Sequence, residues 1–486
     1  MHWLVGPIVG GVGVVVLIIT VVLGWVVVPN IIDDRIIEEV RLVPGTDTWE
    51  KWEEIPVPIN LNFYTYSITN PDDVERGSRP IFEEKGPYSY REERKKVNVS
   101  LVDGDDVVRY EQTITYFFNR STSCPTCFED DKINIINVAF LSVIMVVHDE
   151  VSPWLAAFIA NGALGTETFV RRDVRVGDLT FEGFDTRLYS ETLGPLLPEE
   201  FSGGRFGLYK GTNGSADGVY EIYTGVGKTA DFGRVKTYEG LETLDELGWW
   251  QNGTFCSKIN GTDGSLFPPF VEKSWVMYVF STDLCRSLYL TFEKEVEHRG
   301  IKGYRFVAPK KMLENPRTNP DNQCFCMEEY LEDCPHSGVI HIKGCKGGAP
   351  IMMSTPHFLD GDERYLNASQ LSKPVKEKHE TVIDVEPNSG LTLRANKRIQ
   401  VNVEVIPVGG IDALEHIKEY MVFPLIWADE EAILDEVNAD DLKGRLLTPL
   451  KIVNIGKWTV LGVSVAIIAL GAAIFVIQRR NARETV

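Results

Sequence analysis

The chain has 486 residues, of which 44% are hydrophobic and 10% aromatic, and its formal net charge is -21, from 49 basic and 70 acidic side chains. This composition is ample for a large buried core and argues against a disordered chain. The acidic excess also argues against a nucleic-acid partner, because binding to phosphate depends on a surplus of Lys and Arg.

Two uncharged stretches lie near the ends of the chain. Residues 3–28 would reach roughly 39 Å as a helix, against a hydrocarbon core of about 30 Å. No basic residue precedes this stretch and it ends in valines before Pro29, so it is predicted to be an uncleaved anchor rather than a signal peptide. Residues 458–477 form a second such stretch, and the arginines that follow it mark the cytosolic side of the membrane.

Two anchors predict a chain with both termini in the cytosol and a single large ectodomain between the anchors. The predicted parts are a cytosolic stub with the first anchor (residues 1–29), the ectodomain (30–456), the second anchor (457–478) and a cytosolic tail (479–486).

Both anchors contain small residues four positions apart, a spacing that lets helix backbones approach closely in lipid. The pairs are Gly6 with Gly10, Gly462 with Ala466, and Ala469 with Ala473. The simpler interpretation of this spacing is that Gly and Ala are common in membrane helices. The sharper hypothesis is that the two anchors pack together or onto another copy of the chain, which would make a homo-oligomer.

Between the anchors, hydrophobic and polar residues alternate in several short segments, which predicts β-strands. These segments are residues 55–66, 107–118, 218–223, 303–308, 390–393 and 399–405. Strands and helices do not alternate regularly, so an antiparallel α+β fold is predicted. Residues 428–445 mix acidic and apolar side chains and are predicted to form an amphipathic surface helix.

Two apolar segments stand out within residues 133–162. Residues 138–147 are nearly all apolar but too short to span a bilayer. A helix is predicted to start at Ser152 and Pro153, and it places Trp154, Leu155, Phe158 and Ile159 on one face. Both segments either pack in the core or form a partly exposed apolar surface that receives a hydrophobic ligand or partner.

His148 lies among charged residues just after the first apolar segment. A histidine there has the chemistry to titrate between extracellular and endosomal pH. An exposed histidine without a role is the simpler interpretation.

Six glycosylation sequons and all eight cysteines lie between the two anchors. The sequons begin at Asn98, Asn119, Asn213, Asn252, Asn260 and Asn367. An even number of cysteines beside glycan acceptors indicates disulfides formed in the secretory pathway. Cys124 and Cys127 have the spacing of a redox dithiol or half a zinc site, but no second such pair is present, so a local disulfide is favoured.

The other six cysteines allow up to 15 connectivities on sequence alone. They are Cys256, Cys285, Cys324, Cys326, Cys334 and Cys345.

No catalytic, metal or cofactor site is predicted, and the protein is not expected to be an enzyme. Gly227-Lys228-Thr229 suggests a phosphate-binding loop, but Ile222 stands where the motif needs its first glycine. His379 and Glu380 lack the second histidine of a zinc protease motif, which leaves a metal one ligand short.

Several short motifs resemble those of the class B scavenger receptor family. They include Gly86-Pro-Tyr-Ser-Tyr-Arg-Glu, Phe267-Pro-Pro-Phe, Leu284-Cys-Arg-Ser and Asn319-Pro-Asp-Asn-Gln-Cys-Phe-Cys. The resemblance extends from the first anchor to the second. It implies a twisted antiparallel β core with an apical helical bundle that contains residues 133–162, and disulfides Cys256–Cys324, Cys285–Cys345 and Cys326–Cys334.

The resemblance also implies a function: a cell-surface receptor that binds lipids or lipid-bearing particles and passes lipid to the membrane through an apolar tunnel in the ectodomain. The implied partners are fatty acids, sterols, carotenoids or phospholipids, or lipoprotein particles. The alternative is a recognition or trafficking receptor that binds a protein through the apical helices without conducting lipid.

The candidate ligand-binding residues at the apex are Val147, His148, Trp154, Leu155, Phe158, Arg171, Arg172 and Arg175. The family often has lysines just before the segment that matches residues 168–170, whereas here the basic residues are the three arginines, which weakens the expectation of binding to anionic lipoprotein surfaces. The tail lacks an acidic dileucine signal like that of the lysosomal family member, so the plasma membrane is favoured, with an endosomal pool.

Overall fold

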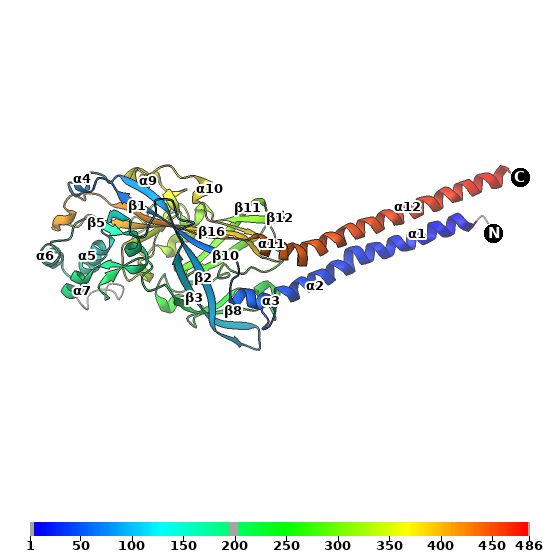
Figure 1. Cartoon of the computed structure of the whole chain (residues 1–486), viewed down its shortest axis with the longest axis horizontal. Coiled ribbons are helices and arrows are strands. Elements are labelled where there is room, and N and C mark those ends of the chain that lie inside the picture. The colour runs from blue at the N-terminus through cyan, green and yellow to red at the C-terminus, as the bar shows by residue number, and fades with distance from the viewer. Residues whose placement is uncertain (1–3, 194–202, 485–486) are drawn as a thin grey trace. The chain divides into compact units, whose positions relative to one another are not determined.

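The computed structural model describes residues 4–193 and 203–484, and the chain divides into two compact units (Figure 1). The first unit contains Met1–Arg41 and Asp435–Val486, and the second contains Leu42–Leu434. Trp3, the predicted first residue of the N-terminal anchor, lies outside the described residues.

The first unit contains the two apolar helices. Val5–Val40 and Glu436–Asn481 are each long and apolar enough to cross a membrane. The N-terminal helix consists of α1 (Val5–Val22), the π-helical turn η2 (Leu23–Val27) and α2 (Val28–Val40). The wider π-helical turn ends two residues before Pro29. Proline has no N–H, and in a regular α-helix its ring would clash with the carbonyl four residues earlier, which here belongs to Trp25 within the turn. The helix therefore continues past the predicted end at residue 28.

The C-terminal helix consists of α11 (Glu436–Leu442), the π-helical turn η14 (Lys443–Leu447) and α12 (Thr448–Glu484). It packs against α1 through glycines. A Cβ atom on Gly6 would lie 2.6 Å from the backbone nitrogen of Phe475, and one on Gly471 would overlap the backbone of Gly10. Trp25 and Trp458 pack edge to face with ring centroids 5.4 Å apart. The two helices thus pack together, which is one of the two arrangements that the small residues suggested.

We expect Gly471→Leu to separate α1 from α12, because the added side chain has no room against Gly10. Gly462→Leu is the matched control, since nothing lies within 4 Å of a Cβ atom at that glycine. In a background with cysteines in place of Trp25 and Trp458, a short bismaleimide should cross-link the two helices of the unchanged chain in membranes. Cross-linking should fall several-fold with Gly471→Leu and persist with Gly462→Leu. Equal cross-linking in both would show that the glycine contact does not hold the helices together.

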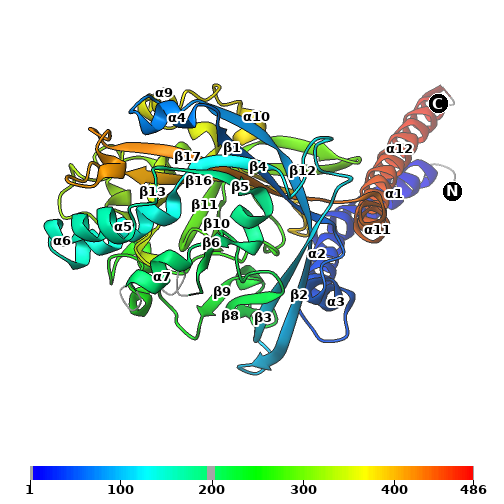
Figure 2. The same cartoon turned by 60° about the vertical axis from the view of Figure 1, so that its left-hand side comes forward.

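The second unit is built on a 13-stranded sheet in which the paired strands are antiparallel (Figure 2). Its main strand order is β10-β11-β12-β15-β16-β17-β1-β2-β3-β8-β9, and β13 and β14 join it through β16. The α+β class with antiparallel strands is therefore confirmed. β1 lies between β17 and β2, and Ile59 on β1 pairs with Ala432 on β17.

The strands of this sheet are β1 (Ile59–Ile68), β2 (Phe82–Val102), β3 (Val107–Phe118), β8 (Ser215–Tyr223), β9 (Val235–Tyr238), β10 (Val276–Ser281), β11 (Arg286–His298), β12 (Ile301–Val307), β13 (Val339–His341), β14 (Ile351–Ser354), β15 (Val382–Val385), β16 (Thr392–Val405) and β17 (Met421–Ile433).

The prediction of one amphipathic helix over residues 428–445 was wrong in its first part. Ala428 belongs to β17, where it pairs with Phe63 on one side and Ile399 on the other. Helix α11 begins only at Glu436, and the Asp435 side chain caps it by accepting a hydrogen bond from the Asn438 N–H at 2.8 Å. Pairing with a strand on each side outweighs the helical pattern of the isolated segment.

A small helical subdomain completes the second unit, and its helices α5, α6 and α7 gather at one end of it (Figure 2). It contains a two-stranded sheet of β4 (Lys132–Ile136) and β5 (Val170–Arg175). Its helical segments are α5 (Val138–Glu150), α6 (Pro153–Phe158), the π-helical turn η3 (Ile159–Ala163), the π-helical turn η4 (Asp178–Glu182) and α7 (Arg187–Leu193). Phe140 and Ile144 of α5 belong to the same core cluster as Phe423 of β17, so this subdomain and the large sheet share one core.

Candidate functional site

Helix α5 lies within the core. Its buried residues include Val138, Ala139, Phe140, Leu141, Val143, Ile144 and Val147. The Asn137 side chain caps its start by accepting a hydrogen bond from the Phe140 N–H at 3.3 Å. The core-packing interpretation therefore holds for this segment. Of the two candidate ligand-binding residues on α5, Val147 is 1% exposed and belongs to the core, while His148 beside it is half-buried.

The helix formed by α6 and η3 has two unlike faces. Ala156, Ala160 and Leu164, spaced by four residues, are buried. Trp154 and Phe158, also four residues apart, are 72% and 71% exposed and are the most exposed aromatic side chains among the described residues. The exposed-surface interpretation therefore holds for this segment. We call these two side chains the apical aromatic pair; Leu155 beside them is half-buried.

The apical aromatic pair stands on a fixed support. The Asn161 side chain donates to the Gly410 carbonyl at 2.8 Å and to the Asp412 carboxylate at 3.2 Å. It also accepts a hydrogen bond from the Asp412 N–H at 3.0 Å. These bonds fasten the turn that follows Phe158 to a loop far along the chain. The exposure of the two rings is therefore a property of a packed helix rather than of a loose loop.

The three candidate arginines are all paired with carboxylates. Arg171 lies 3.4 Å from Glu167, donates to the Asp185 carbonyl at 2.8 Å and stacks over the Phe184 ring at 4.5 Å. Arg172 pairs with Asp72 at 2.7 Å. The partners of Arg175 are Asp130 at 2.5 Å, Glu182 at 3.0 Å and Asp178 at 3.5 Å. Within the described residues, strand β5 thus presents no arginine without a carboxylate partner.

Glu167 connects Arg171 to the start of α5. Its carboxylate accepts hydrogen bonds from the Asn137 amide at 2.9 Å and from the Tyr189 hydroxyl at 2.7 Å. Burial and the neighbouring Glu167 charge raise the pKa of Tyr189. The hydroxyl therefore stays protonated and remains a donor throughout the physiological pH range.

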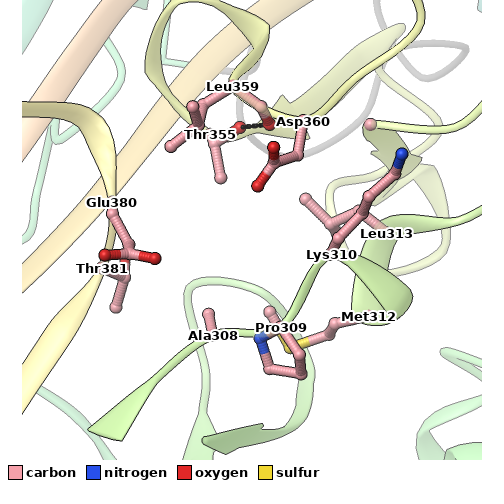
Figure 3. Close-up of a pocket in the computed structure, with 11 residues that line it drawn as sticks. Ala308, Pro309, Lys310, Met312, Leu313, Thr355, Leu359, Asp360, Glu380 and Thr381 are labelled. Atoms are coloured by element: carbon pink, nitrogen blue, oxygen red, sulfur yellow. Dashed lines mark hydrogen bonds between the residues drawn. The ribbon is translucent and has the colours of Figure 1, made fainter. Parts of the chain in front are cut away.

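A separate small pocket lies beside the 3₁₀ turns η9 (Lys310–Leu313) and η12 (Pro356–Phe358), with a cavity volume of about 30 Å³ (Figure 3). Glu380 and Thr381 line one side of it, and Asp360 and Lys310 lie across from them. Burial raises the pKa of Glu380, although Lys376 partly opposes this. No local sequence pattern predicts this pocket, because its lining residues come from segments that are far apart in the chain, at 308–313, 338, 355–360 and 380–381.

The structure contains four disulfides: Cys124–Cys127, Cys256–Cys324, Cys285–Cys345 and Cys326–Cys334. The first is the local disulfide that its spacing favoured, and the other three are the pairs that the family resemblance implied. Among the sequon asparagines, Asn98, Asn213, Asn252 and Asn367 are exposed, whereas Asn119 and Asn260 are half-buried. Each of the six therefore has some access to solvent.

These features define a membrane protein in which a large disulfide-bonded β unit lies between two apolar helices in the sequence. Residues 11–475 match the sequence profile of the CD36 family. The chain belongs to this family, the class B scavenger receptors, as its motifs suggested.

Three relatives illustrate the range of the family. Lysosome membrane protein 2 of Homo sapiens is 34% identical over 426 residues, which cover 87% of this chain and 85% of that protein. Sensory neuron membrane protein 1 of Manduca sexta is 30% identical over 482 residues, with 96% and 90% covered. Scavenger receptor class B member 1 of Rattus norvegicus is 29% identical over 441 residues, with 90% and 82% covered. These names describe membrane proteins and a receptor rather than enzymes.

Proposed function

We propose that this protein is a cell-surface receptor that binds lipids or lipid-bearing particles through the apical aromatic pair and passes lipid to the membrane through an apolar tunnel in its ectodomain. The observation that carries the proposal is the exposure of Trp154 and Phe158 on a helix whose opposite face is packed in the core. Membership of the class B scavenger receptor family supports it. We further propose that both termini are cytosolic and that the ectodomain comprises residues 30–456, with the plasma membrane as the main location.

The energetics of the surface suit an apolar ligand. Large aromatic side chains bury about 150–250 Å² each, so full burial of a ring that is now mostly exposed is worth roughly 3 to 4 kcal/mol before ordering costs. The nearby arginines already have carboxylate partners. Binding should therefore depend mainly on apolar contact and only weakly on salt, unlike binding driven by unpaired basic residues.

Replacing both Trp154 and Phe158 with alanine should lower the affinity for lipid particles at least tenfold. The test uses the full chain in nanodiscs and fluorescent phosphatidylcholine emulsion particles at low and high salt. Because both side chains are more than two-thirds exposed, the thermal unfolding midpoint should stay nearly unchanged. The matched control is Tyr330→Ala, whose side chain is 57% exposed in the loop closed by Cys326–Cys334. Undiminished binding by the double variant would remove the apical aromatic pair from the proposal.

A second candidate function rests on the same rings. Trp is enriched at the centres of protein–protein interfaces, so the apical aromatic pair also suits a receptor that binds a protein and conducts no lipid. Mass spectrometry of lipids that copurify with the full chain separates the two. Bound lipid in stoichiometric amount supports the lipid receptor, and a lipid-free chain whose binding to a protein ligand needs Trp154 supports the alternative.

A further inference from the structure

Arg286 is a buried cation without a counter-charge. It is the first residue of β11 and is 2% exposed. Its Nε and Nη1 atoms are buried and have no hydrogen-bond acceptor among the described residues. Two other guanidinium groups of this unit do meet carboxylates: the buried Arg398 lies 3.0 Å from Asp429, and the half-buried Arg94 lies 2.7 Å from Glu92. The buried Lys96 ammonium instead donates to the neutral Gln112 side chain at 3.1 Å. Arg286 therefore departs from the way in which the chain accommodates buried guanidinium groups elsewhere.

An aromatic ring covers one face of this guanidinium. The centroid of the Phe325 ring lies 3.3 Å from the guanidinium carbon, and Trp250 packs edge to face against the same ring at 5.0 Å. The Trp250 indole N–H donates to the Cys285 carbonyl at 2.5 Å. A ring stacked on the flat face leaves the N–H groups at the edge of the guanidinium still in need of an acceptor.

Disulfides hold both sides of this arrangement. Arg286 follows Cys285, which is bonded to Cys345. Phe325 stands between Cys324 and Cys326, which are bonded to Cys256 and Cys334. The position of the buried cation is thus fixed by the covalent framework, and the side chain cannot easily move out to solvent.

A second unpartnered polar group faces the same way. Ser281 on β10 is the direct cross-strand partner of Arg286, and side chains at paired positions lie on the same face of a sheet. The Ser281 hydroxyl is buried and has no hydrogen-bond partner among the described residues. A guanidinium edge and a hydroxyl, each buried and without a hydrogen-bond partner among the described residues, therefore lie on the same face of the sheet.

An uncompensated buried charge is strongly destabilising, and a cation–π contact offsets only part of that cost. Burial lowers the pKa of Arg286 to about 9, because removal from water destabilises the charged form of the guanidinium. A water molecule satisfies an N–H group but leaves the charge uncompensated. We propose that Arg286 and Ser281 form a binding site for a small monovalent anionic group, either a free anion such as chloride or the carboxylate of a fatty acid.

The test is thermal unfolding of the full chain in detergent at constant ionic strength. In the first arm, chloride or acetate replaces gluconate as the anion of the salt. In the second arm, gluconate is kept as the salt and oleate is compared with oleyl alcohol, which has the same hydrocarbon chain without the charge. A ligand that binds only the folded state at 100 times its Kd stabilises that state by about 2.7 kcal/mol, which should appear as a rise of a few degrees in the midpoint.

Either of two results supports the site. A rise with chloride or acetate identifies a free anion, and a rise with oleate but not with acetate or oleyl alcohol identifies a lipid carboxylate. No rise in any arm would overturn the proposal. That outcome leaves the proposed lipid receptor intact, since particle binding through the apical aromatic pair is measured separately.

Variants connect the effect to the two residues. Arg286→Met should abolish the dependence of the midpoint on the anion. Should that variant fail to fold, Ser281→Ala, which removes only a hydroxyl, should weaken the anion effect several-fold. Thr392→Val is the matched control, because it removes another buried hydroxyl that has no partner among the described residues, on β16. An anion effect lost equally in Ser281→Ala and Thr392→Val would contradict the assignment.

Discussion

Replacing Cys285 and Cys345 together with serine is expected to lower the free energy of unfolding by about 4 kcal/mol. The Cys285–Cys345 disulfide closes a loop with a sequence separation of 60 residues, so its loss frees a large part of the unfolded chain. Since whole domains are typically stable by only 5–15 kcal/mol, this is a large fraction of the total. Denaturant unfolding of the full chain in detergent, followed by tryptophan fluorescence, measures the effect.

The control is the pair Cys124 and Cys127, whose disulfide spans a separation of only three residues. The same chain-entropy relation gives about 2 kcal/mol for replacing both with serine. An equal loss in both double variants would show that loop entropy does not set the contribution of these disulfides.

Asp384→Ala is expected to lower the free energy of unfolding by about 3 kcal/mol, because it leaves the partly buried guanidinium of Arg305 without its carboxylate. Asp384 is fully buried and accepts two hydrogen bonds from Arg305, at 2.6 and 2.7 Å, from the neighbouring strand β12. The imidazole of His298 on β11 lies 2.6 Å from the same carboxylate. Denaturant unfolding of the full chain, followed by tryptophan fluorescence, measures the loss.

Two comparisons sharpen this prediction. Glu295→Ala breaks the exposed pair of Glu295 and Lys273 and should change stability by less than about 1 kcal/mol. Replacing Asp384 and Arg305 together with leucine removes both charges and should restore much of the loss. A single Asp384 variant as stable as the Glu295 variant would refute a structural role for the buried pair.

The Asp384 pair also predicts a dependence on pH. Burial alone would raise the pKa of Asp384, but the hydrogen bonds from Arg305 and His298 outweigh burial and hold the pKa below its usual value. The stabilisation is therefore complete above the unfolded pKa of about 3.9 and is lost as pH falls through the lowered folded value. Asp384→Asn should flatten the loss of stability below roughly pH 4, which thermal midpoints across an acid series would show.

Local sequence patterns predicted the elements that depend on near neighbours. Residues 107–118, rich in β-branched and aromatic side chains, were predicted as a strand and form β3 over that range. The two apolar stretches became long helices because their composition leaves no other structure stable in lipid. The family motifs supplied the disulfide pairs, which the spacing of the cysteines left open.

The candidate site was only partly predictable, because it depends on partners that are distant in the sequence. The sequence presented Arg171, Arg172 and Arg175 as candidate ligand-binding residues, yet Asp72 and Asp130 approach from elsewhere in the chain and pair with Arg172 and Arg175. The helical pattern predicted Trp154 and Phe158 on one face. Which face meets the core was decided by Ala156 and Ala160, whose small side chains allow close packing.

The central position of β1 has a consequence for how the protein is made. Ile59 on β1 pairs with Ala432 on β17, about 370 residues later. The first strand of the large sheet therefore cannot pair with the last until the intervening residues have been synthesised, which imposes a wait. At a synthesis rate of roughly 5 to 20 residues per second, that wait is about 20 to 75 s. Through this period one edge of β1 can pair with β2, but the edge that pairs with β17 has no permanent neighbour and remains open to wrong pairing. A nascent chain of this protein should therefore depend strongly on chaperones of the secretory pathway until its final strand emerges.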